Sequence, residues 1–128
     1  MSEQVSVKAA GSNQELQRST QDTILDVRGL HTYFFTNLGV ARALNGVTYS
    51  IPREKVLGVV GESGCGKSVT ARSIMRLIQP PGRIVKGEIV LHRQRGDQAE
   101  DVMLTDLGKH STEMRRIRGG EMAMIFQE

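Results

Sequence analysis

An eight-residue motif near the middle of the chain constrains the fold more than any other feature of the sequence. It begins at Gly61 and ends at Ser68, and it matches the pattern Gly-x-x-x-x-Gly-Lys-Ser/Thr in full. Residues 56–60 before it form a short, apolar, β-branched run that predicts a buried strand. Residues 68–78 after it space their apolar side chains as on one face of a helix. A strand, a glycine-rich loop and a helix are therefore expected in succession.

The residue types of this loop suit the binding of a triphosphate. Glycines allow the backbone to turn tightly, so that successive N–H groups and the positive end of the new helix face an anion. Lys67 is expected to reach the β- and γ-phosphates, and the Ser68 hydroxyl is expected to ligate Mg²⁺. The alternative is a glycine-rich turn that merely joins strand to helix. The predicted nucleotide-binding residues of the loop are Gly61, Glu62, Ser63, Gly64, Cys65, Gly66, Lys67, Ser68 and Val69.

Length and composition limit the remaining possibilities. A chain of 128 residues with 38% hydrophobic and 24% charged residues fits one modest, soluble, globular domain. The single cysteine, Cys65, cannot form an internal disulfide, which suits a reducing cytoplasm. No apolar run approaches the roughly eighteen residues of a membrane span, and the polar start of the chain lacks a signal peptide. Any membrane association is therefore expected to be indirect.

The charge distribution gives no sign of a nucleic-acid partner. The formal net charge is only +3 and is spread along the chain. Its densest basic patch, at residues 115–118, is more typical of a solvated helix face than of a nucleic-acid site. No nucleic acid is expected among the partners.

Periodicity and turn residues divide the rest of the chain. Residues 1–21 are polar and without periodicity, which predicts a disordered tail, and residues 22–128 are expected to form the folded part. A polar loop is expected at 93–101, and a helix within 105–118 that turns Leu107, Met114 and Ile117 inward. Further strands are expected at residues 24–35, 40–51 (interrupted by a turn at 45–46), 84–92 and 122–126. The fold class is α/β.

The acidic groups that usually accompany such a loop are hard to find. A phosphate-loop enzyme normally places an acidic residue after an apolar strand to hold Mg²⁺. The apolar run ending at Phe126 has that shape, but it is followed by Gln127 and Glu128. Asp106 is the other candidate, and its apolar run is short. Neither completes a hydrolytic site.

Two stretches together resemble a known family. Residues 59–70 and residues 114–128, including the spacing between them, resemble the ATP-binding subunits of ABC transporters, most of all the oligopeptide, dipeptide and nickel importers. This resemblance implies a P-loop core with an antiparallel β-subdomain. It also implies that Gln127 is the Q-loop glutamine, which approaches Mg²⁺ and the attacking water. An aromatic residue upstream would stack on adenine; Phe34 is favoured, with Tyr33 and Phe35 as alternatives.

The resemblance carries functional expectations and one clear departure. It implies ATP and Mg²⁺ as cofactors, permease subunits and a second ATP-binding subunit as partners, and a place at the cytoplasmic face of the membrane. The Leu-Ser-Gly-Gly-Gln signature, the Walker B aspartate, the catalytic glutamate and the switch histidine are absent from the sequence. The chain therefore resembles the N-terminal part of such a domain, predicted to be inactive alone. Its three histidines, His31, His92 and His110, are expected at the surface.

Two other classes remain open. One is a small stand-alone P-loop kinase or nucleotide switch that uses Asp106 or Glu128 for Mg²⁺. The other is a non-enzymatic interaction module that keeps the loop only to bind anions.

Overall fold

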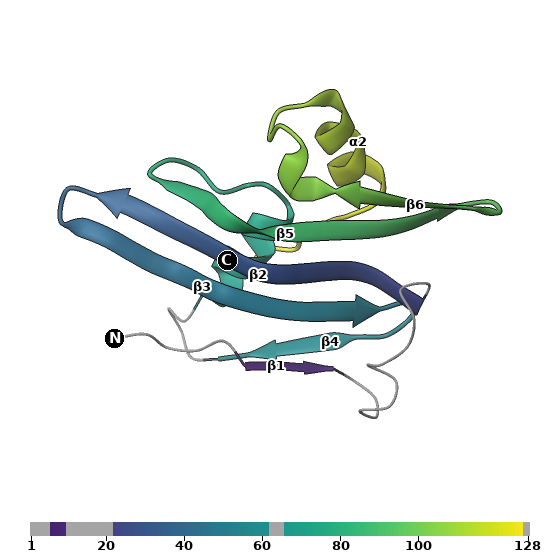
Figure 1. Ribbon diagram of the computed structural model, residues 1–128, viewed down its shortest axis with the longest axis horizontal. Helices are drawn as coiled ribbons and strands as arrows, with labels where there is room; N and C mark the ends of the chain where they lie inside the picture. Colours follow the sequence, from purple (N-terminus) through teal and green to yellow (C-terminus); the bar gives the residue numbers. More distant parts are fainter. Residues whose placement is uncertain (1–5, 10–21, 62–65, 127–128) are drawn as a thin grey trace.

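The computed structural model describes residues 6–9, 22–61 and 66–126, which form two antiparallel sheets and two helices. The larger sheet has the strand order β3-β2-β5-β6, and the smaller pairs β1 with β4 (Figure 1). The strands are β1 (Ser6–Ala9), β2 (Thr23–Thr36), β3 (Gly39–Pro52), β4 (Leu57–Val60), β5 (Gly82–Arg95) and β6 (Gln98–Met103). The helices are α1 (Lys67–Ile74) and α2 (Thr112–Gly120), with a 3-10 turn at Leu104–Asp106.

The long β2–β3 hairpin confirms the first two predicted strands. Its two strands meet at a tight turn that ends at Gly39, whose φ of 129° suits glycine. The predicted turn at 45–46 is wrong, because β3 runs through it without a break. Instead, Gly46 is an extra residue between the pairs Leu30–Val47 and His31–Asn45, which is the register shift of a β-bulge. A bulge absorbs the Asn-Gly pair without ending the strand.

The predicted polar loop at 93–101 is also wrong, because most of it is paired. β5 continues to Arg95, β6 begins at Gln98, and the two residues between them form the hairpin turn. Gly96 in that turn has a φ of 63°. A Gly-Asp pair between two strands is a typical two-residue hairpin signal. The charged side chains of this hairpin are exposed except for that of Arg93, which is buried.

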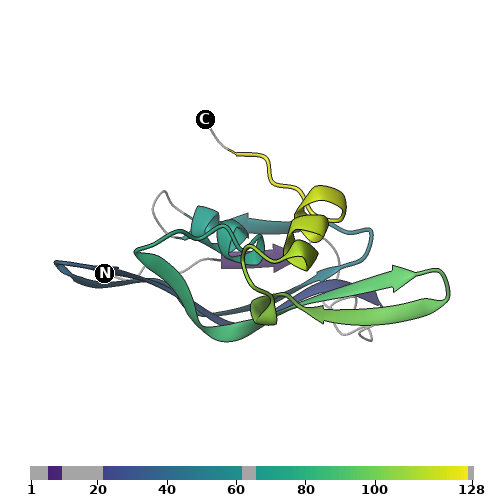
Figure 2. The same cartoon turned by 90° about the horizontal axis from the view of Figure 1, so that it is seen from above.

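Both helices are shorter than predicted, and both lie on the same side of the four-stranded sheet (Figure 2). α1 ends early because Arg76 adopts a φ of 57°, which no helix can continue. α2 begins only at residue 112, where the Ser111 hydroxyl accepts a hydrogen bond from the N–H of Met114 at 3.2 Å. Met114 and Ile117 are fully buried, as expected, and Leu107 packs at the edge of the core. The core consists of Leu25, Val27, Leu30, Leu44, Ile74, Ile89, Leu91, Val102, Leu104, Met114 and Ile117.

Three further expectations are corrected at the margins of the fold. β4 is half-exposed rather than buried, since it pairs only with β1 and the side chain of Val60 is 50% exposed. β1 itself lies inside the stretch predicted to be disordered; the rest of residues 1–21 lies outside the described part. Residues 122–126 form no strand, and Ile125 and Phe126 are 97% and 57% exposed. An apolar run becomes a strand only where a neighbouring strand can pair with it.

Candidate functional site

The described ends of the glycine-rich loop lie as a phosphate-binding loop requires. β4 leads into Gly61, and α1 begins directly after Gly66, whose φ of 101° is open to glycine and strained for other residues. The Lys67 ammonium donates to the carbonyl oxygen of Gly61 at 2.5 Å, so the lysine bridges the two ends of the loop. Glu62, Ser63, Gly64 and Cys65 lie outside the described residues.

The first turn of α1 is held firmly while its outer face stays open. The Thr70 hydroxyl and the Thr70 N–H both donate to the carbonyl of Gly66 at 2.8 Å, and Thr70 is buried. Lys67 and Ser68 are exposed, and Val69 is partly buried against the core. The N–H groups at the start of a helix have no intrahelical acceptor, which leaves them for a ligand.

Further along, a buried polar contact attaches α1 to the sheet. The hydroxyls of Thr32 on β2 and Ser73 on α1 lie 2.8 Å apart, and both residues are fully buried. Since a buried hydroxyl without a partner is costly, the pair fixes the rotation of the helix over the sheet. The start of α1 is thereby given a fixed orientation.

These residues fit the phosphates of a nucleotide. A left-handed glycine, an exposed ammonium and an exposed hydroxyl at a helix start supply the geometry, the positive charge and the oxygen ligand that a Mg-triphosphate needs. No group of three His, Cys, Asp or Glu side chains in residues 22–61 and 66–126 is arranged to hold a metal ion. At nucleotide sites Mg²⁺ is usually held by phosphate oxygens, water and one or two protein ligands.

The three aromatic residues at the end of β2 point to alternate faces. The ring of Phe34 packs on Gly82, where an added Cβ would approach it within 2.5 Å. Tyr33 and Phe35 share the other face, with ring centroids 6.4 Å apart. The guanidinium of Arg83 lies 4.6 Å from the Phe35 centroid, a cation–π contact. Phe34 thus lies near the segment that follows α1, rather than at the described ends of the glycine-rich loop.

The remaining candidates contribute less to the described structure. Gln127 and Glu128 lie outside the described residues. Asp106 is exposed in the 3-10 turn after β6. Of the arginines predicted to be solvated, Arg115 and Arg116 are exposed, but Arg118 is not: it donates to three backbone carbonyls.

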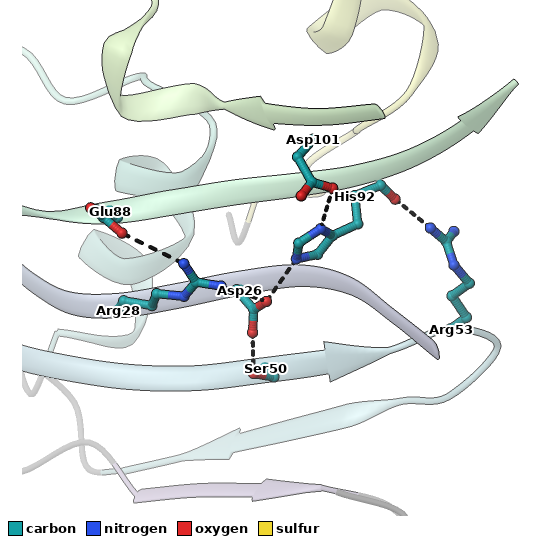
Figure 3. A network of polar contacts seen from close by, with 7 residues as sticks. All are labelled: Asp26, Arg28, Ser50, Arg53, Glu88, His92 and Asp101. Carbon is teal, nitrogen blue, oxygen red and sulfur yellow. Dashed lines mark hydrogen bonds and ion pairs between the residues drawn. The ribbon is translucent and has the colours of Figure 1, made fainter. Parts of the chain in front are cut away.

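A polar network inside the four-stranded sheet escaped sequence reasoning (Figure 3). His92 on β5 lies between two carboxylates, with Nε2 2.7 Å from Asp26 and Nδ1 2.6 Å from Asp101. Its side chain is 7% exposed, so the expectation of a surface histidine is wrong for His92. Ser50 donates to the second oxygen of Asp26, and Arg53 donates to the His92 carbonyl.

This network shifts the ionisation of its members. Burial alone lowers the pKa of His92, but hydrogen bonds to Asp101 and Asp26 outweigh burial and raise it above its usual value. Burial alone raises the pKa of Asp26, but hydrogen bonds from Ser50 and His92 and the charge of Arg28 lower it overall. The arrangement is structural, because it joins β2, β3, β5 and β6.

A strand, a left-handed glycine, a lysine turned back over the loop and a helix are together the arrangement of the P-loop nucleotide-binding proteins. The family model described as "ABC transporter" matches residues 44–128, about two-thirds of the chain. The chain belongs to the ABC transporter family.

Its relatives include several proteins named for peptide transport. It is 43% identical over 108 residues to the "Probable peptide ABC transporter ATP-binding protein y4tR" of Sinorhizobium fredii, covering 84% of this chain and 29% of that protein. It is 38% identical over 109 residues to the "Dipeptide transport ATP-binding protein DppD" of Bacillus subtilis, again covering 84% and 29%. For the "Glutathione import ATP-binding protein GsiA" of Escherichia coli O157:H7 the identity is 40% over 106 residues, covering 82% and 16%. The chain thus spans less than a third of the length of these relatives.

The described residues contain no helix that is both long enough and apolar enough to cross a bilayer.

Proposed function

We propose that this chain forms the N-terminal part of the nucleotide-binding domain in the ATP-binding subunit of an ABC importer for peptides. The observation that carries the proposal is the conformation at the end of the loop, where Gly66 has a φ of 101° and Lys67 folds back to the Gly61 carbonyl. This conformation supports a loop that receives phosphate oxygens. The peptide substrate is suggested by the relatives' names, two of which specify peptides or dipeptides.

Within this proposal, each loop residue has its own role in binding the nucleotide. Residues 61–66 present backbone N–H groups to the phosphates, Lys67 neutralises their charge, and Ser68 ligates Mg²⁺. Val69 packs the helix start against the core. Bound Mg²⁺ would withdraw charge from the phosphate oxygens.

Two residues outside the loop complete the proposed site. Gln127 would contact Mg²⁺ and water through its side-chain amide, which can both accept and donate. Phe34 would stack on adenine, a contact worth about 1–3 kcal/mol. Its ring packs on Gly82, and the alternatives for this contact are Tyr33 and Phe35.

The proposed partners follow from the family. A permease embedded in the membrane would hold the subunit at the cytoplasmic face, and a second ATP-binding subunit would close over the nucleotide. The stand-alone kinase alternative gains no support, because among the described residues Asp106 makes no hydrogen bond or ion pair with Lys67 or Ser68.

Nucleotide titration tests the proposal directly. The chain should bind Mg-ATP, and Lys67→Ala should weaken binding by roughly tenfold or more, since it removes a charge-assisted contact worth about 1.5–3 kcal/mol. The matched control is Lys86→Ala, which removes an exposed lysine of β5 that lies far from the motif in the sequence. Calorimetric titration of both variants measures the difference. Equal weakening by the two substitutions, or no binding by the unaltered chain, would contradict the proposal.

A further inference from the structure

A second cationic pocket lies at the opposite end of α1 from the phosphate loop. It has a volume of about 270 Å³ and forms where the segment after α1 meets the segment before α2. Three basic side chains line it, namely Arg76, Arg83 and Lys109, and the other lining residues are apolar or glycine. No carboxylate lines it. An α-helix rises about 1.5 Å per residue, so the eight residues of α1 separate the two sites by roughly 12 Å along the helix.

The positive charge at this pocket is not balanced by acidic side chains. In the part of the chain that the structure describes, no carboxylate forms an ion pair with Arg76, Arg83, Lys109 or the neighbouring Arg118. By contrast, Arg93, which lies on β5 like Arg83, forms ion pairs with three glutamates. The pocket therefore brings together basic side chains that no carboxylate balances.

Backbone carbonyls hold these cations in place without neutralising them. Arg118 donates to the carbonyl of Met75 at 3.1 Å, and Lys109 donates to the carbonyl of Ile78 at 2.5 Å. Arg76 donates through Nη2 to Leu107 at 3.2 Å. These contacts satisfy the carbonyls at the end of α1 and join the two segments. Each cation keeps its full formal charge.

One donor in the pocket's wall has no acceptor. The Nε atom of Arg76 is buried and makes no hydrogen bond in the described structure. Burial and the nearby charge of Arg118 lower the pKa of Arg76, which shows that the ionised form is penalised here. Arg76 also adopts a positive φ of 57°, a strained conformation for a non-glycine residue. An anion in the pocket would offset the charge repulsion between Arg76 and Arg118.

We propose that this pocket binds a phosphate group through Arg76, Arg83 and Lys109. Guanidinium groups present paired donors that match the oxygens of phosphate, and three unpaired cations suit an anion with more than one charge. The volume holds a small group rather than a polymer. The phosphate would belong to a small soluble molecule or to a phospholipid headgroup. The site uses no residue of the glycine-rich loop, but it adjoins the proposed adenine contact, because Arg83 lies over the ring of Phe35.

Phosphate titration in a Lys67→Ala background tests the proposal, because this background weakens the response of the glycine-rich loop. Inorganic phosphate, at ionic strength matched with sodium chloride, should shift the Nε–H resonance of Arg76 and raise the melting temperature saturably. Arg83→Gln and Lys109→Gln should each weaken the response by roughly tenfold. The matched control is Arg42→Gln, since Arg42 is also exposed and lies over an aromatic ring, that of Tyr33 at 5.5 Å, but does not line the pocket.

The outcomes separate the possible sources of the phosphate. Vesicles of phosphatidylcholine with phosphatidylglycerol that bind the chain through Arg83, while pure phosphatidylcholine vesicles do not, identify a lipid headgroup. A response to inorganic phosphate without vesicle binding identifies a soluble molecule. The proposal is overturned if chloride acts as phosphate does, or if Arg42→Gln weakens binding as much as Arg83→Gln.

Discussion

At the scale of single residues, the protonation of His92 is fixed by its two carboxylate neighbours. Both ring nitrogens lie within hydrogen-bond distance of a carboxylate oxygen, and a histidine can donate from both nitrogens only as the imidazolium. The cation then holds Asp26 of β2 and Asp101 of β6 against β5. A neutral imidazole would leave one carboxylate facing a lone pair.

The stability of the chain should therefore depend on pH with a defined sign. The folded pKa of His92 lies above 6.5, so its contribution is complete below pH 6.5 and is lost as the pH rises through the folded value. The folded pKa of Asp26 lies below 3.8, so its contribution is complete above pH 3.8 and is lost as the pH falls through the folded value. Urea unfolding should show the largest contribution of this pair between these two limits.

Substitution isolates the histidine. His92→Gln should lower the free energy of unfolding in acid and remove the decline on the alkaline side of pH 6.5. The control is His110→Gln, which changes an exposed histidine and should keep the decline. If His92→Gln retained the full alkaline decline, another group would be its source.

Sequence reasoning proposed Gly66, Lys67 and Ser68 for the candidate site, and their role in binding stays a prediction. It could propose them because their chemistry is local to one short motif, whereas it missed this network. His92 depends on Asp101, and the two meet only because β5 and β6 pair across the turn at Gly96 and Asp97. Recognition of that Gly-Asp turn would have placed them opposite each other.

At the scale of elements, β5 approaches its neighbour β2 so closely at one position that only glycine fits there. A Cβ at Gly87 would lie 2.5 Å from the carbonyl oxygen of Gly29 and 2.7 Å from the Cα of Leu30, and φ at Gly87 is 110°. Backbone atoms cannot move aside as the end of a flexible side chain can. Gly87 thus marks a close approach of two strands.

Gly87→Ala should consequently destabilise the sheet. We expect a loss of about 1–3 kcal/mol in the free energy of unfolding, from the left-handed backbone and the close contact. Gly119→Ala in α2 is the matched substitution, since no atom lies within 4 Å of its added Cβ and its φ is ordinary. It should stabilise the helix by up to about 1 kcal/mol. Relative to the unaltered chain, the denaturant midpoint should fall for Gly87→Ala and rise for Gly119→Ala. Equal shifts of the two midpoints would contradict the prediction.

The elements predicted correctly are those with a local signature. The signature of the β2–β3 hairpin is its turn, and that of α1 is the glycine-rich loop before it. The signature of α2 is the helical spacing of Met114 and Ile117. Residues 122–126 were expected to form a strand on hydrophobicity alone, but a strand also requires a partner. β1 was missed for the converse reason, because only its pairing with β4 makes it a strand.

At the scale of the whole molecule, the two sheets differ in how well they are secured. β2 is paired on both sides, by β3 and β5, and contributes buried side chains to the core. β4 is paired only with the four residues of β1, and its side chains are half-exposed. β4, the strand that leads into the glycine-rich loop, is thus less protected than β2.

Hydrogen exchange should reveal this difference. We expect amides of residues 25–27 to exchange at least roughly tenfold more slowly than those of residues 57–60, because a local opening of β4 breaks fewer contacts. Mass spectrometry or NMR of the chain without nucleotide measures both sets in one sample. Equal protection of the two strands would show that the sheets open together.

The strand order of the larger sheet has a kinetic consequence. β2 meets β3 across a tight turn. The pairing of β2 with β5, in contrast, brings Phe34 opposite Gly82 and so encloses the segment that carries β4, the glycine-rich loop and α1. The entropy lost on ring closure grows with the length enclosed, so the hairpin forms first and the arrival of β5 is the slow event. The loop thereby acquires its final surroundings late, and competence to hold a ligand should emerge with the last strand pairing rather than with the first collapse.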